Sequence, residues 1–194
     1  MYLAKILIYI SILIWLLPPF RQLKGGYFLY FLILGYSDPL ALLLLKFIKL
    51  NANYTHLIVA FLLAISILYY AKNLNVKWGI ILFLFLILSL FINIREIRYF
   101  SIISFHGLIL SQLLILSIKE FYQESKINLY YFVLLVYELA TIFKYIAFVY
   151  NYTSGVYYFY LSAAFEMLIC IYFIFFNFQN SPYIKAQFAS KKDF

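Results

Sequence analysis

The stretch from Tyr137 to Tyr145 reads Tyr-Glu-Leu-Ala-Thr-Ile-Phe-Lys-Tyr and places a carboxylate and an ammonium within one apolar run. The next apolar run carries a second carboxylate, Glu166. On insertion scales, an unpaired charge near the centre of a membrane helix costs about 2.5 to 3.5 kcal/mol. We therefore expect these charges to have partners, and the organisation of the chain decides which partners they can reach.

The composition is typical of an integral membrane protein. Of the 194 residues, 67% are hydrophobic and 11% are charged, and the mean hydropathy is +0.96. Soluble domains are about 45 to 50% apolar and about 25% charged. A membrane-spanning helix needs about 20 apolar residues, which leaves room for about six or seven crossings and for no soluble domain. Long apolar runs without two-residue alternation favour helices over barrel strands.

Seven apolar runs predict an all-α bundle of about seven transmembrane helices. The runs cover 3–17, 27–45, 55–71, 78–93, 99–118, 129–150 and 156–177. Residues 1–177 would form one domain, and 178–194 a short basic tail that is mobile or lies along the lipid headgroups. The second run contains Asp38-Pro39. Because this pair is typical of a helix start, we expect the second helix to be broken there into two halves.

The distribution of positive charge predicts the orientation. Nine Lys and Arg residues lie in the odd-numbered connections and the tail, and five lie at the N-terminus and in the even-numbered connections. Cytoplasmic connections are enriched in these residues, so the N-terminus is expected outside and the C-terminus in the cytoplasm. The plasma membrane is the favoured location, and an organelle inner membrane is the alternative. The net charge of +8 is explained by anionic lipid headgroups rather than by nucleic acid.

The fifth run carries the polar residues of a packing or binding face. Ser104, Gly107 and Ser111 recur at intervals of three and four residues, which predicts a stripe of small side chains that lets a neighbouring helix approach. His106 lies beside this stripe, and Gln112 lies nearer the middle of the run. Both are candidates for a ligand or proton site, although a lone histidine in an apolar run is more often a hydrogen-bonded core residue.

The sixth and seventh runs carry the strongest candidates. Glu138 and Glu166 fall near the middle of their runs, hence near the bilayer midplane. At about 100° per residue, Glu138, Thr141, Lys144 and Tyr145 share one helix face. Glu138 and Lys144 are too far apart along the helix for a direct salt bridge. We expect Lys144 to pair with Glu166 and Glu138 to be neutral and hydrogen-bonded, because one ammonium compensates one carboxylate.

The sequence contains none of the common catalytic motifs. Gly-x-Ser-x-Gly, His-Glu-x-x-His and a phosphate-binding glycine loop are all missing from it. Two histidines and the single Cys170 show no ligand spacing. The sequence therefore predicts no cofactor, no metal site and no intrachain disulfide.

Three functions are compatible with these features. The favoured one is a non-catalytic module that binds a small ligand, or a partner membrane subunit or second copy, through a polar face of the last three helices. The second is a proton-coupled transporter or channel that uses the midplane carboxylates and the broken second helix. The third is a lipid-modifying membrane enzyme, for which the sequence offers no nucleophile. The buried charges are open to a structural interpretation, as a bridge between helices, and to a functional one, as a site.

Overall fold

The computed structural model describes residues 2–23, 25–92, 94–150, 152 and 156–185. In chain order its elements are α1 (Tyr2–Trp15), α2 (Pro18–Arg21), α3 (Phe28–Ile48), α4 (Ala52–Tyr70), α5 (Val76–Phe91), α6 (Arg95–Glu124), β1 (Lys126–Asn128), α7 (Leu129–Val149), α8 (Val156–Phe175) and β2 (Tyr183–Lys185). The prediction of an all-α chain is confirmed apart from the two short strands. Residues 186–194 of the predicted tail and most of the predicted 151–155 turn lie outside the described residues.

Each of the seven apolar runs corresponds to one helix. Four of these helices, α3, α4, α6 and α7, are long and apolar enough to cross a membrane, and α1, α5 and α8 provide shorter apolar helical stretches. The additional helix α2 is a single turn that begins at Pro18-Pro19. Proline is favoured there because a first helical turn needs no intrahelical N–H donor.

The predicted break in the second run is wrong, because α3 continues through Asp38 and Pro39. Pro39 removes one backbone donor, whose acceptor in a regular helix would be the carbonyl of Gly35. The Ser37 hydroxyl donates to the Leu34 carbonyl at 2.7 Å and reinforces the same turn. Backbone groups in apolar surroundings need hydrogen-bond partners, so packing against neighbouring helices favours a continuous helix over an open break at the proline.

The predicted limits of the fifth run are also wrong. The run 99–118 is part of the 30-residue helix α6, which begins at Arg95 and ends at Glu124. Arg, Lys, Glu and Gln have high helix propensities, so the charged residues at both ends extend the helix instead of ending it. The helix stops at Ser125, which adopts a left-handed conformation with φ of 52°, as is typical of a helix C-terminus.

Asparagine side chains determine where three helices begin. Asn51, Asn75 and Asn128 precede α4, α5 and α7, and each side chain accepts a hydrogen bond from a backbone N–H of the first turn. Asparagine is among the best residues for this position because its oxygen satisfies a donor that lacks an intrahelical partner. These caps therefore fix the starts of the three helices close to the predicted boundaries between polar connections and apolar runs.

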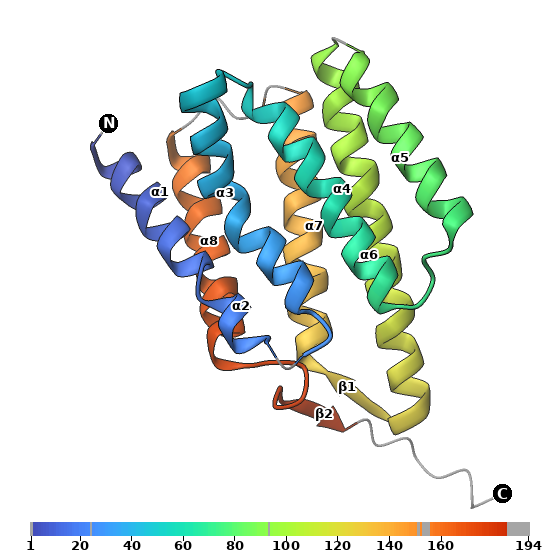
Figure 1. The fold of residues 1–194 in the computed structure, drawn as a ribbon. Coiled ribbons are helices and arrows are strands. Elements are labelled where there is room, and N and C mark those ends of the chain that lie inside the picture. The colour runs from blue at the N-terminus through green and yellow to red at the C-terminus, as the bar shows by residue number, and fades with distance from the viewer. Residues whose placement is uncertain (1, 24, 93, 151, 153–155, 186–194) are drawn as a thin grey trace, which may run out of the picture.

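The helices are arranged in two layers. In Figure 1, α1, α3 and α4 lie in front of α8, α7 and α6, and α5 lies at one edge against α4 and α6. The connections that follow α1, α4 and α6 lie at the lower end of the bundle, whereas those after α3 and α5 lie at the upper end (Figure 1). The chain therefore runs alternately up and down, as expected for consecutive membrane crossings.

Strand pairing fixes the beginning of the tail. Strand β2 pairs antiparallel with β1, with Lys185 opposite Lys126, and the Leu129 N–H donates to the Pro182 carbonyl at 3.0 Å. Residues 183–185 are therefore held in a strand, and the alternative expectation, that the tail lies along the lipid headgroups, stays a prediction. The pairing also places these tail residues at the same end of the bundle as the connection between α6 and α7 (Figure 1).

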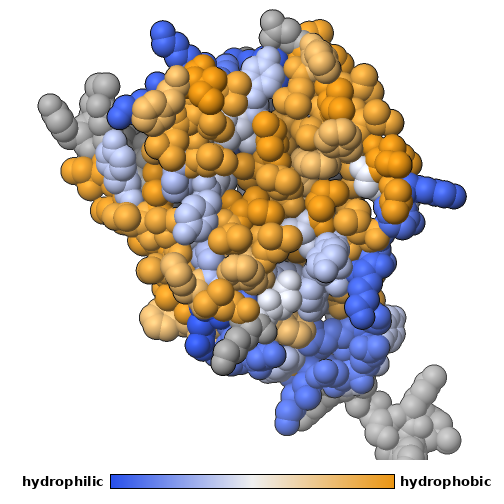
Figure 2. Space-filling view, viewed as in Figure 1, coloured by the Kyte–Doolittle hydropathy of each residue, from blue (hydrophilic) through white to orange (hydrophobic). Residues whose placement is uncertain are grey.

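Large apolar side chains cover the outside of the bundle. Phe91, Val76 and Leu161 are 84%, 79% and 73% exposed. Figure 2 shows hydrophobic residues over most of the visible sides of the helices, while hydrophilic residues gather toward the end that carries β1 and β2. Contiguous apolar surface of this extent is rare in soluble monomers and is compatible with contact with lipid.

The small-residue stripe of α6 is not a packing seam. Ser104 and Ser111 are exposed, and a Cβ atom added to Gly107 would meet nothing within 4 Å. The hydroxyls instead donate to carbonyls of their own helix, Ser104 to Phe100 and Ser111 to Leu108. The opposite face of α6, which carries Phe105 and Ile109, packs into the core instead.

Candidate functional site

A polar cavity of about 80 Å³ lies inside the bundle. Described residues of six helices line it, and those of α2 and α5 do not. The lining residues are Trp15, Leu34, Ser37, Asp38, His56, Val59, Leu63, His106, Tyr137, Thr141, Lys144, Tyr145 and Glu166. A single water needs about 10 to 15 Å³ by the same measure, so the cavity has room for several waters or a small polar group.

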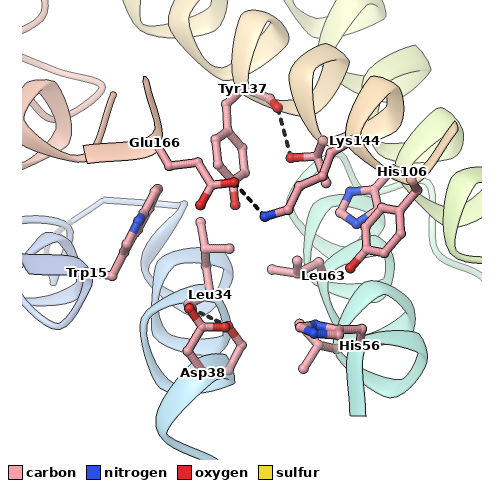
Figure 3. A pocket seen from close by; sticks show the side chains of 13 residues that line it. Trp15, Leu34, Asp38, His56, Leu63, His106, Tyr137, Lys144 and Glu166 are labelled. Carbon is pink, nitrogen blue, oxygen red and sulfur yellow. Dashed lines mark hydrogen bonds and ion pairs between the residues drawn. The ribbon is translucent and has the colours of Figure 1, made fainter. Parts of the chain in front are cut away.

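The predicted pair between Lys144 and Glu166 is present in the structure. Nζ of Lys144 lies 2.7 Å from Oε1 of Glu166, a contact that joins α7 to α8. Figure 3 shows the two side chains pointing toward one another across the cavity. Their side chains are 33% and 26% exposed, so the pair is accessible from the cavity and is not sealed within the core.

Glu138 occupies a different environment from Glu166. Its side chain is fully buried and accepts a hydrogen bond from the Tyr30 hydroxyl on α3. Its other carboxylate oxygen lies 2.7 Å from Nδ1 of His106 on α6. As expected from the sequence, Glu138 is hydrogen-bonded and Lys144 pairs elsewhere. Glu138 does not line the cavity, but His106 does and links the two.

The helical geometry of α7 explains why its two charged residues have different partners. At about 100° per residue, Glu138 and Lys144 lie ~120° apart around the helix axis. Glu138 therefore faces α3 and α6, whereas Lys144 faces α8. Thr141 lies between them and lines the cavity, while its hydroxyl donates to the Tyr137 carbonyl at 3.0 Å.

The other walls bring together residues from distant parts of the sequence. Asp38 of α3 and His56 of α4 lie across the cavity from the charged pair (Figure 3). Asp38 is exposed, and its carboxylate forms no hydrogen bond or ion pair with the described residues. The buried Tyr145 stacks on His106 with ring centroids 6.0 Å apart, and its ring edge faces His56 at 6.3 Å.

Most, but not all, of the candidate residues meet at this site. Gln112 lies apart from it, because its Oε1 accepts a hydrogen bond from Asn73 at the end of α4. Several residues of the cavity and of the Glu138 network were not candidates from the sequence, among them Trp15, His56 and Tyr30. Trp15 and His56 lie near helix ends, and Tyr30 is one of 21 tyrosines, so nothing in the sequence distinguished them from packing or interfacial residues.

An apolar groove adjoins the polar cavity. It lies between α7 and α8, has a volume of about 390 Å³, and is lined by Tyr137, Ala140, Thr141, Phe143, Lys144, Leu161, Ser162, Phe165 and Glu166. Four of these residues also line the polar cavity: Tyr137, Thr141, Lys144 and Glu166. The charged pair therefore lies at the boundary between a polar space and an apolar one.

Neither metal-ligand geometry nor similarity to known proteins adds an assignment. Within the described ranges, no group of three or more His, Cys, Asp or Glu residues is placed to hold a metal ion. The chain matches no protein-family model, no curated protein and no solved structure. The function must therefore be argued from the cavity itself.

Proposed function

We propose that this protein is a non-catalytic, seven-crossing membrane protein that binds a small ligand in the polar cavity. The observation that supports this function is the cavity itself, which collects Asp38, His56, His106, Lys144 and Glu166 from five helices in the interior of an apolar bundle. Ionisable residues at membrane depth are rare and usually mark functional sites. A purely structural bridge between α7 and α8 would need only two of these five residues.

The proposed topology places the N-terminus outside and the C-terminus in the cytoplasm of the plasma membrane. The charge distribution supports this orientation. The strand pair supports one part of this topology, because β1 and β2 hold the connection after α6 and the start of the tail at the same end of the bundle and hence on the same side of the membrane. In this arrangement α1, α5 and α8 cross the membrane together with the four longer helices, and a second copy or another subunit remains a further binding partner to test.

A co-purifying small molecule would test the proposal. Native mass spectrometry of the detergent-extracted protein should detect an added mass on the wild type. Thr141→Leu, which places a bulky apolar side chain between cavity and groove, should lose that mass. Leu139→Phe is the matched control, since Leu139 is exposed on the same helix and should leave the mass in place. If the mass remains on a folded Thr141→Leu protein, or if the wild type carries none, the proposed cavity function is contradicted.

A second candidate function, proton-coupled transport, is favoured by one observation. His106 lines the cavity and contacts Glu138, which in turn contacts Tyr30, so three titratable groups form a continuous hydrogen-bonded chain away from the cavity. Such chains can relay protons. In liposomes with a pH-sensitive dye inside, transport would give a proton flux that Glu138→Gln abolishes. A wild-type flux no larger than that of empty liposomes would rule out this candidate.

A further inference from the structure

We propose that the ligand is a single-chain amphiphile with a protonated amine head, which lies in the polar cavity, and an alkyl chain, which lies in the groove between α7 and α8. This inference rests on the proposed function and specifies the chemical class of its ligand. The amine enters from the bilayer, because the groove is an apolar surface between two helices.

The charge balance of the cavity favours a cation. Its lining contains two carboxylates, Asp38 and Glu166, and one ammonium, Lys144. Lys144 and Glu166 compensate one another at 2.7 Å. Asp38 forms no ion pair with the described residues, and Lys144, which attracts it electrostatically, is already paired with Glu166. A carboxylate at membrane depth is stabilised by an opposite charge, and a protonated amine supplies one together with hydrogen-bond donors.

The aromatic lining favours the same head group. The side chains of Trp15, Tyr137 and Tyr145 line the cavity, and the rings of Trp15 and Tyr137 are tilted against each other with centroids 5.4 Å apart. Aromatic faces attract cations, and protein sites for organic ammonium groups combine such faces with a carboxylate. An anionic head would instead meet the carboxylates of Asp38 and Glu166, of which only Glu166 is ion-paired with a described residue.

The two volumes match the two parts of an amphiphile. A space of about 80 Å³ is too small for a whole organic ligand, since binding pockets usually measure about 300 to 1,000 Å³. The groove, at about 390 Å³, falls within that range and has the apolar walls that an alkyl chain requires. Because both spaces share Tyr137, Thr141, Lys144 and Glu166, one molecule can occupy both at once.

Trp15 provides a reporter for the test. The chain contains two tryptophans, and the other, Trp78, is exposed on α5 away from the cavity. In a Trp78→Phe background, fluorescence therefore reports on Trp15 alone. The protein in phosphatidylcholine nanodiscs is titrated with octylamine, octanol, octanoate and ethylamine. We expect octylamine to change the fluorescence of Trp15 saturably, with a half-saturating concentration about ten-fold lower than that of octanol. One hydrogen bond to a charged group accounts for a difference in affinity of this size. Octanoate and ethylamine should bind more weakly than octylamine.

Two variants test the binding of the amine head and of the alkyl chain of the ligand separately. Asp38→Asn should remove the preference for octylamine over octanol, because it keeps the shape and removes the charge. Ala140→Phe, whose residue lines the groove and not the cavity, should weaken octylamine and leave ethylamine unchanged. Leu139→Phe places the same phenylalanine side chain at a neighbouring exposed position and should change neither.

The outcomes distinguish this inference from the function on which it rests. Octanoate binding as tightly as octylamine, or an unchanged preference in Asp38→Asn, overturns the amine head. Ethylamine binding as tightly as octylamine, or unchanged octylamine binding in Ala140→Phe, overturns the alkyl chain in the groove. In all four cases, a co-purifying mass that is lost in Thr141→Leu would leave the small-ligand cavity standing. If none of the four probes alters Trp15 and no mass co-purifies, both are overturned.

Discussion

At the level of single residues, the contact between Lys144 and Glu166 is the interaction that the sequence identified and the structure contains. The sequence sufficed here because few charged residues occur in the last two runs, so the number of pairings was small. The partners of Glu138 could not be found in the same way. Tyr30 is one aromatic residue among many, and 108 residues separate it from Glu138, so only the packing of α3 against α7 selects it.

The first prediction concerns the Lys144–Glu166 pair. Lys144→Met and Glu166→Gln should each destabilise the protein by about 1 to 3 kcal/mol, because each leaves a charge without its partner in a partly buried site. The double variant should be more stable than either single variant. Thermal melts in one detergent provide the measurement. Losses that add in the double variant would show that the two charges are energetically independent.

A second prediction concerns the buried Glu138 network. Tyr30→Phe should cost about 0.5 to 1.5 kcal/mol, since it removes one hydrogen bond and leaves His106 in place. Glu138→Ala should cost more, because it leaves two buried donors without an acceptor and creates a cavity. Tyr36→Phe is the matched control on α3, as Tyr36 is 50% exposed. Equal losses for the two tyrosine variants would contradict the importance of the Tyr30 hydrogen bond.

At the level of the helices, the lengths of the apolar runs and the positions of the polar connections predicted which helices form. The residues at which the helices begin and end depend also on capping side chains and on helix propensity. The predicted break at Asp38-Pro39 failed because a local pattern typical of soluble helix starts competes with the strong requirement for backbone hydrogen bonds in lipid. The small-residue stripe on α6 failed for another reason. The spacing of Ser104, Gly107 and Ser111 defines a face, but it carries no information on which neighbour, if any, covers that face.

The third prediction tests the packing of α3 against α1. A Cβ atom on Gly35 would lie 2.5 Å from the backbone oxygen of Trp15, so Gly35→Ala should cost about 1 to 3 kcal/mol through overpacking. Gly107→Ala, in open space on α6, should be neutral or stabilising by up to about 1 kcal/mol, because alanine favours helices. Thermal melts of both variants provide the comparison, and an unchanged melt for Gly35→Ala would contradict the close approach.

At the level of the whole molecule, the sequence predicted an all-α membrane chain from composition and could not predict how the helices meet. The cavity illustrates the difference. The sequence assigned the polar face to the last three helices, yet α1, α3 and α4 also contribute Trp15, Asp38 and His56. Those residues meet only because the two layers pack against one another, and a single sequence contains no record of that packing.

The fourth prediction concerns topology. A reporter fused after Phe194 should behave as cytoplasmic, and one inserted between 151 and 155 should behave as external, because in the proposed topology α8 is the single crossing between these two points. The strand pair offers an independent check. In the detergent-purified protein under oxidising conditions, cysteines replacing Lys126 and Lys185, which are opposite each other, should form a disulfide in a Cys170→Ser background. Both reporters on one side would remove α8 from the set of crossings.

The two charged residues of α7 have partners from different parts of the sequence, one set before α7 and the other after it. Glu138 contacts Tyr30 and His106, which are synthesised earlier, while Lys144 contacts Glu166, which is synthesised later. When α7 leaves the ribosome, Glu138 can meet partners that have already been synthesised, whereas the contact between Lys144 and Glu166 requires α8. The contact that joins α7 to α8 is therefore the last of these three that can form during biogenesis, and the final helix completes the polar cavity by supplying Glu166.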